Sequence, residues 1–297
     1  MIGTDWGTAV LSKTAVRVDE RSQVRTELCF WDAEGGRLFI ATTLPRGRPR
    51  AGVVVCSPIK AEHSTIYDIQ SALAWALAER GFAVQRFHYR GEGESEGQPD
   101  ELSFEGMCQD ARLAWRRLED RTGTSPVAFV GARVGGTVAA TLRAEAPDAP
   151  LVIWDPIPDP AAYFREVYRY RLLADLPLGG SPRSSFQTEL DEQGSVHVLG
   201  FQLHRRLYES FLEASLEKAL AGSTGPVLLV QLGGGIRSRS DELANSLRGS
   251  GFSLDSSSIS GKLPWWLHHA SAGSRIDEEA LISASADWLT ERAGGSG

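Results

Sequence analysis

The stretch VAFVGARVGGTVAA, residues 127–140, decides the fold of this chain. An apolar run typical of a strand buried on both faces ends at the turn 131–136, and a helical pattern begins at once. This order of strand, glycine-rich turn and helix is the setting of a G-x-S-x-G nucleophile elbow. Glycine permits the sharp turn and close packing of the helix on the sheet. Arg133 stands where that motif carries serine.

Apolar runs of strand length recur along the chain, at 52–56, 82–87, 151–154 and 227–230. Helical patterns lie between them, at 67–80, 103–122 and 136–146. This alternation predicts βαβ units and an α/β fold, with a mainly parallel central sheet and helices on both faces. The segments 26–31 and 37–43 flank a glycine-containing turn and predict an antiparallel hairpin at the sheet edge.

The domain organisation follows from where the pattern changes. Residues 157–223 are rich in aromatic and arginine side chains at helical spacing, and they include an expected helix over 200–220. This insertion predicts a helical cap, because a simple crossover needs far fewer residues. We therefore expect a core at 25–156 and 224–292 that closes with a helix over 277–292. The remaining parts are an N-terminal extension at 1–24 and a flexible tail at 293–297.

Composition limits the classes of partner. The 297 residues hold 31 Lys and Arg against 38 Asp and Glu, a formal net charge of −7, without a basic block, so nucleic acid is not expected. The three scattered cysteines form no disulfide or metal pattern, and we expect neither a metal nor a cofactor. The sequence shows no signal-like start and no long apolar run, which predicts a cytoplasmic protein without a membrane partner.

A second glycine-rich loop, FHYRGEGES at 87–95, resembles the D-x-R-G-x-G-x-S loop that precedes the elbow in α/β-hydrolases. With the elbow, the chain resembles that superfamily over roughly residues 25–292. Four segments are similar to the branch described as exosortase-A-system-associated hydrolase 2, namely 58–62, the Gly-x-Arg-x-Gly elbow, 154–157 and 264–266. The resemblance implies hydrolysis of ester, thioester or amide bonds of a small apolar acid, in polysaccharide or natural-product biosynthesis.

The positions of the hydrolase triad depart from that pattern. Arg133 replaces the nucleophile, and glycines 233–235 stand where the acid normally follows its strand. The next acid, Asp241, falls within an expected helix. Lys262 occupies the usual place of the histidine, and His268 and His269 follow several residues later. The sequence therefore indicates a degenerate triad.

Arg133 itself imposes a physical requirement. A guanidinium stays protonated and offers only hydrogen-bond donors, so it can be neither a nucleophile nor a general base. It also faces the positive end of the following helix, which calls for an anion beside it. Glu62 can supply that anion as an internal ion pair. Alternatively, a ligand carboxylate or phosphate is held by Arg133 and the backbone N–H groups of Val134–Gly136; we favour the internal pair.

Further side chains are candidates for the same site. His63 is either a general base or a hydrogen-bonded loop residue, and Asp155 at the end of its strand is either a relocated acid or structural. With Arg133 and Glu62, His63 completes the predicted catalytic set. The predicted substrate-binding set is Val134, Gly135, Trp154, Asp155, Lys262 and Trp265.

Three hypotheses about function remain open. In the first, the protein retains a pocket for a small acidic or acyl ligand, used for non-covalent recognition or acid–base chemistry. In the second, it is a non-catalytic pseudoenzyme that binds a partner protein or a second copy of itself, with the former site locked by Glu62 and Arg133. In the third, it hydrolyses its substrate with a relocated nucleophile, Ser57 or Cys56.

Overall fold

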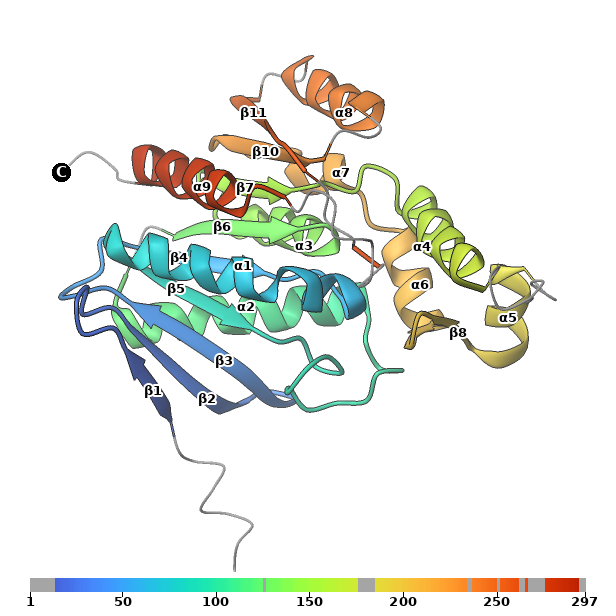
Figure 1. Cartoon of the computed structure of the whole chain (residues 1–297), viewed down its shortest axis with the longest axis horizontal. Helices are drawn as coiled ribbons and strands as arrows, with labels where there is room; N and C mark the ends of the chain where they lie inside the picture. Colours follow the sequence, from blue (N-terminus) through green and yellow to red (C-terminus); the bar gives the residue numbers. More distant parts are fainter. Residues whose placement is uncertain are drawn as a thin grey trace, which may run out of the picture.

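The computed structural model describes residues 14–124, 127–175, 185–233, 237–249, 252–261, 265–266 and 276–293. Within them, nine strands form one sheet in the order β1-β2-β3-β5-β4-β6-β7-β10-β11 (Figure 1). The strands are β1 (Ala15–Val18), β2 (Arg25–Ala33), β3 (Gly36–Leu44), β4 (Ala51–Cys56), β5 (Phe82–Phe87), β6 (Val127–Ala132), β7 (Leu151–Trp154), β10 (Val227–Leu232) and β11 (Leu254–Ile259).

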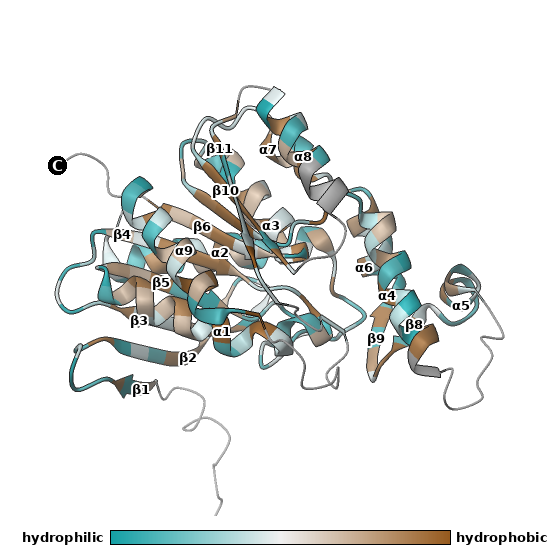
Figure 2. Cartoon of the chain, turned by 45° about the horizontal axis from the view of Figure 1, so that its top comes forward, coloured by the Kyte–Doolittle hydropathy of each residue, from teal (hydrophilic) through white to brown (hydrophobic). Residues whose placement is uncertain are grey.

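The sheet is parallel from β5 to β11, and its other edge is the antiparallel run β1-β2-β3-β5. The predicted α/β fold is therefore confirmed, including the hairpin of β2 and β3. β1 joins the sheet from within the predicted N-terminal extension. The middle strands are hydrophobic along most of their length (Figure 2), as burial on both faces requires.

Helices cover both faces of the sheet. α1 (Lys60–Glu79) packs beside α9 (Glu278–Arg292), while α2 (Phe104–Thr122) packs beside α3 (Val134–Leu142), and α8 (Arg237–Gly249) packs on β11. Ser103 caps α2 by accepting a hydrogen bond from the Gly106 backbone N–H at 3.1 Å, as its N-terminal position predicts. Among the described residues, no helix combines the length and the apolar character needed to cross a membrane.

The insertion differs from the purely helical cap that the sequence predicts. It contains α4 (Pro160–Asp175), α5 (Phe186–Gln193), α6 (Arg205–Leu212) and α7 (Leu216–Leu220), and also a hairpin of β8 (Ser195–Val198) and β9 (Phe201–His204). The helix expected over 200–220 is wrong at its start. Leu199 and Gly200 adopt φ of 50° and 90°, and two successive left-handed residues make the tight turn of a hairpin.

The turn between β6 and α3 has no room for side chains at its glycines. A Cβ at Gly135 would lie 2.3 Å from the carbonyl oxygen of Cys56 and 2.4 Å from that of Ser57. A Cβ at Gly131 would lie 2.3 Å from the carbonyl oxygen of Gly135. The glycines therefore let α3 pack directly against the end of β4 and hold residue 133 between them.

We predict that Gly135→Ala lowers the free energy of unfolding by about 1–3 kcal/mol, because the added methyl group forces backbone atoms apart. Gly249→Ala is the matched control, since no heavy atom lies within 4 Å of a Cβ at that helical position. The control should be neutral or stabilising by up to about 1 kcal/mol. Urea denaturation measures both variants, and equal effects would contradict the packing argument.

Candidate active site

Residue 133 has the strained backbone of an elbow. Arg133 adopts φ 51° and ψ −123°, a conformation that L-residues rarely adopt. Its backbone N–H donates to the carbonyl oxygen of Trp154 at 3.0 Å, and its carbonyl oxygen accepts from Gly136 at 2.9 Å. These bonds fix the turn between β6 and α3, so the side chain projects from the carboxyl end of the sheet, where α/β sheets bind ligands.

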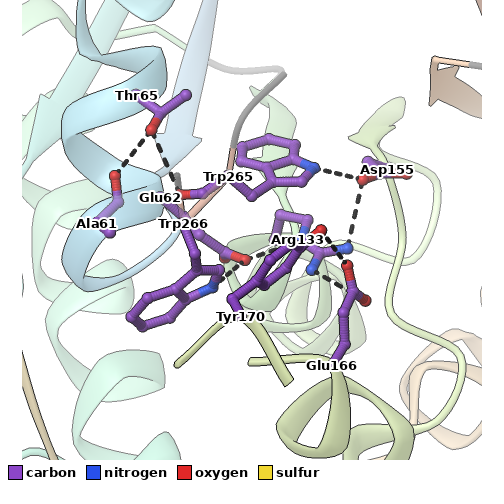
Figure 3. A network of polar contacts seen from close by, with 9 residues as sticks. All are labelled: Ala61, Glu62, Thr65, Arg133, Asp155, Glu166, Tyr170, Trp265 and Trp266. Atoms are coloured by element: carbon purple, nitrogen blue, oxygen red, sulfur yellow. Dashed lines mark hydrogen bonds and ion pairs between the residues drawn. The ribbon is translucent and has the colours of Figure 1, made fainter. Parts of the chain in front are cut away.

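The guanidinium of Arg133 faces three carboxylates from three separate elements (Figure 3). Its Nε lies 3.1 Å from Oε1 of Glu62 in α1, and its Nη1 lies 3.3 Å from Oδ2 of Asp155 after β7. Its Nη2 lies 3.7 Å from Oε2 of Glu166 in α4. The internal Glu62–Arg133 ion pair that the sequence favours is therefore present, and α4 brings the insertion over the elbow.

Aromatic side chains enclose this charge cluster, which comprises Arg133, Glu62, Asp155 and Glu166. The guanidinium carbon lies 5.1 Å from the ring centre of Tyr163 and 5.3 Å from that of Trp265, at cation–π distance. Three aromatic donors bind the carboxylates, namely Trp266 to Glu62 at 2.9 Å, Trp265 to Asp155 at 2.7 Å and Tyr170 to Glu166 at 3.1 Å.

Burial and charge act against each other within the cluster. Arg133 is only 6% exposed and Glu62 is fully buried. Burial lowers the pKa of Arg133, but the three carboxylates raise its pKa by more, so the guanidinium stays charged. Burial raises the pKa of Glu62 to about 7, although Arg133 and Trp266 oppose that rise. Burial also raises the pKa of Asp155, against Arg133 and Trp265.

Two polar atoms of the cluster and the hydroxyl of the neighbouring Tyr163 are buried without a close hydrogen-bond partner among the described residues. They are Oε2 of Glu62, Nη2 of Arg133 and the hydroxyl oxygen of Tyr163. Tyr163 lies beside Glu62, to which its hydroxyl can donate; burial first, and then Glu62, raise the pKa of the tyrosine.

The structure does not bring every predicted residue to Arg133. His63 follows Glu62 on α1 but packs its ring against those of Tyr67 and His88, with centroids 5.6 and 4.7 Å away. Successive helical residues point about 100° apart, so Glu62 and His63 serve different faces. Burial lowers the pKa of His63 to about 4, which keeps the ring neutral near pH 7. His63 therefore has its ring contacts away from Arg133, and its catalytic role stays a prediction.

Trp154 also points elsewhere, because its fully buried indole donates to Ser285 in α9 at 2.9 Å. Its role in substrate binding stays a prediction. Val134 and Gly135 are completely covered at the start of α3, and Gly135 offers backbone alone. Asp155 belongs to the cluster and Trp265 packs against it, and their role in substrate binding stays a prediction.

Several predicted positions of the triad lie outside the described residues, namely Lys262, His268, His269 and glycines 234–235. Gly233 directly follows β10 and Asp241 lies within α8, as the sequence predicts. Among the relocated nucleophiles, the Ser57 hydroxyl donates to Oε1 of Gln70 at 2.8 Å. Burial raises the pKa of the Cys56 thiol, which keeps it protonated.

Glu166 is the site residue that sequence reasoning missed. It lies on α4, where charged side chains are spread around the helix. The periodicity of the sequence therefore does not show which charged residue faces the core. Glu166 stands three residues after Tyr163, and helical residues at that spacing share a face. The spacing from Tyr163, which is buried in the structure, is the signal in the sequence that points to Glu166.

Comparison with known proteins agrees with the fold. The family model described as serine aminopeptidase, S33, matches residues 47–193, just under half of the chain. The uncharacterized protein Rv2307c of Mycobacterium tuberculosis is 29% identical over 198 residues, 66% of this chain and 55% of its own length. Lysophosphatidylserine lipase ABHD12 of Danio rerio is 34% identical over 105 residues, 32% of this chain and 26% of its own. The chain thus spans about half the length, or less, of these curated relatives.

Solved structures extend the likeness over most of the chain. Est1E from Butyrivibrio proteoclasticus with bound ferulic acid has a TM-score of 0.63 at 16% identity, covering 89% of this chain and 98% of that one. XC6422 from Xanthomonas campestris, described as an α/β serine hydrolase without lid, has a TM-score of 0.55 at 15% identity, covering 93% and 97%. The chain has the α/β-hydrolase fold.

We predict that Arg133→Met lowers the free energy of unfolding by about 3–5 kcal/mol, because it leaves buried carboxylates without their cation. The control is Arg165→Met on α4, where the arginine is 66% exposed and the loss should stay within about 0.5 kcal/mol. Glu62→Gln combined with Arg133→Met should recover part of the stability. A loss as small as that of the control would show that the cluster is not held by charge.

The raised pKa of Glu62 predicts a dependence of stability on pH. Its pKa is about 7 in the folded chain against an ordinary 4.5, so the folded state keeps a proton that the unfolded state has released. This stabilisation is complete below pH 4.5 and is lost as the pH rises through 7.

The unfolding free energy of the wild type, minus that of Glu62→Gln, should therefore fall from about pH 5 to about pH 8. The subtraction is needed because buried His63 and His88, with pKa lowered to about 4, act in the opposite sense: their stabilisation is lost as the pH falls through 4. Denaturant titrations across the range measure the difference. A difference that stays constant or rises would contradict the raised pKa of Glu62.

Proposed function

We propose that this protein acts by non-covalent binding and is not a covalent serine hydrolase. One observation carries the proposal: the side chain at the elbow is a guanidinium, held between Glu62 and Asp155 and only 6% exposed. A guanidinium has no lone pair to attack an acyl group. The locked ion pair also fills the space in which a nucleophile and its base would act.

The charge balance of the cluster favours this hypothesis over capture of an acidic ligand by Arg133. Three carboxylates already face the one guanidinium, so its positive charge is more than neutralised when all of them are ionised. A ligand carboxylate or phosphate would have to displace one of these acids. The partner of the protein, whether a small molecule, another protein or a second copy of the chain, is therefore not expected to be an anion that Arg133 recognises.

A second candidate function is proton transfer by Glu62. The pKa of about 7 suits an acid–base group near neutral pH, and its Oε2 atom is not hydrogen-bonded within the described residues. Complete burial of Glu62 weighs against it, because a substrate proton must come within hydrogen-bond reach. A turnover that disappears in Glu62→Gln with intact folding would favour this candidate over binding alone.

We predict that a fluorophosphonate probe does not label the protein and that p-nitrophenyl esters are not hydrolysed above the buffer rate. An active serine hydrolase, treated in parallel, is the control. Arg133→Ser should also stay inactive, because no imidazole of the described residues contacts the elbow. Labelling of the wild type would contradict the proposal, and its loss in Ser57→Ala or Cys56→Ala would identify a relocated nucleophile.

A further inference from the structure

β1 is the outermost strand at one end of the sheet (Figure 1). It pairs with β2 in an unbroken antiparallel register, and no strand of the described residues pairs with its other side. The backbone N–H and C=O groups that point to that side can therefore hydrogen-bond to a further strand. We call this outer side of residues 14–18 the β1 edge.

The β1 edge carries exposed hydrophobic side chains. Val16 is 55% exposed and Val18 is 50% exposed, and they are two of the four large hydrophobic residues that are exposed in the described part of the chain. Residues two apart in a strand share a face, and Thr14 precedes the valines at the same spacing. Three β-branched residues on one face are typical of a strand that pairs on both sides.

The usual protections of an edge strand are missing from β1, which contains neither a proline nor a bulge. Its charged residue, Arg17, lies on the other face, where the guanidinium carbon is 5.5 Å from the ring centre of Trp75 in α1. The opposite edge of the sheet differs. β11 has the sequence LDSSSI, and its Asp255 forms an ion pair with Arg292 at 3.1 Å. Of the two edges, the β1 edge is thus the one suited to pairing.

The charges at the two ends of the segment favour a second copy of the same strand as the partner. The segment 13–19 begins with Lys13 and ends with Asp19. In an antiparallel pair of identical strands, the start of each segment lies near the end of the other, so opposite charges meet at both ends. The backbone N–H of Ser22 donates to Asp19 at 2.7 Å and lowers its pKa, so this carboxylate is ionised near neutral pH.

Repulsion between like charges selects the register. Opposite residues share a face, so the two-fold axis lies between two copies of the same residue. An axis at Arg17 places two guanidiniums opposite each other, and an axis at Ala15 places Lys13 opposite Arg17; both arrangements are destabilising. An axis at Val18 requires the turn that follows the strand to join the sheet. An axis at Val16 meets none of these objections.

We propose that the β1 edge binds the β1 edge of a second copy of this chain, antiparallel and with the two-fold axis at Val16. Val16 then lies opposite the partner's Val16, Thr14 opposite the partner's Val18, and Lys13 opposite the partner's Asp19. The two sheets become one continuous sheet. This inference goes beyond the proposed function, because four strands separate β1 from β6 and its elbow.

Sedimentation of the full chain between about 1 µM and about 1 mM measures the association, since one strand pair is a small interface. The wild type is expected to change from monomer to dimer within this range. Val16→Lys should weaken the dimer about tenfold or more, because it places like charges opposite each other at the axis. Ser258→Lys, at an exposed position of β11, is the matched control and should dimerise normally. A monomeric wild type, or equal losses in both variants, would overturn the proposal.

Single cysteines test the register without relying on a destabilising variant. Opposite residues of an antiparallel pair have Cα atoms about 4.5–5.5 Å apart, which suits a disulfide. Val16→Cys should therefore form a covalent dimer on mild oxidation. Val18→Cys should not, because its two thiols are offset by about 13 Å along the strands. The wild type, with its own three cysteines, is the control. A covalent dimer of Val18→Cys alone, or of neither variant, would overturn the proposal.

The charges at the ends of the pair are tested separately. Lys13→Glu should weaken the dimer about fivefold, because it places a second carboxylate opposite the partner's Asp19. Lys218→Glu makes the same change at an exposed position of α7 and should leave the dimer unchanged. Circular dichroism establishes that each variant is folded. An unchanged dimer in Lys13→Glu would overturn the proposed register.

Discussion

A permanently charged guanidinium at a buried turn must be surrounded by anions, and the structure around the elbow depends on this constraint. Desolvation of one cation costs several kcal/mol unless charges and hydrogen bonds compensate for it. Here Glu62 and Asp155 contact the guanidinium directly, and indole N–H groups of Trp266 and Trp265 hold those carboxylates in turn. The first consequence is chemical, because the elbow has no nucleophile. The second is structural, because Arg133 ties four separate segments together.

Those segments are distant in sequence and meet only because of the sheet. β4, β6 and β7 are adjacent and parallel, so their carboxyl ends place the start of α1, the elbow and Asp155 side by side. α4 follows β7 along the chain and brings Glu166 and Tyr163 into contact with the guanidinium of Arg133. In the folded chain the insertion is thus bonded to the core through the residue that would be the nucleophile of a hydrolase.

Much of this arrangement was predictable from sequence, for reasons that also explain the exceptions. Buried parallel strands are continuous apolar runs, and the glycines at 131 and 135 mark close backbone contacts, so the sequence predicts both the sheet and the elbow. The Glu62–Arg133 pair followed from charge balance and the expected neighbourhood of two loops. The orientation of His63 could not be predicted in the same way. Neighbouring residues of a helix point to different faces, and the sequence does not show which face is turned towards Arg133. The β8–β9 hairpin was missed because FQLHRRLYESF also has helical periodicity, which outweighed Leu199 and Gly200 as a turn.

The central claim, that the guanidinium of Arg133 is locked between carboxylates, is tested most directly by NMR of arginine side chains in the intact protein. A locked guanidinium gives an Nε–H resonance that exchanges slowly with water near neutral pH, together with separate Nη signals because rotation about its bonds is hindered. The resonance is assigned by its loss in Arg133→Lys. We expect one such protected signal for Arg133, shifted by Glu62→Gln. A rapidly exchanging, averaged signal for Arg133 would show a free side chain and contradict the account.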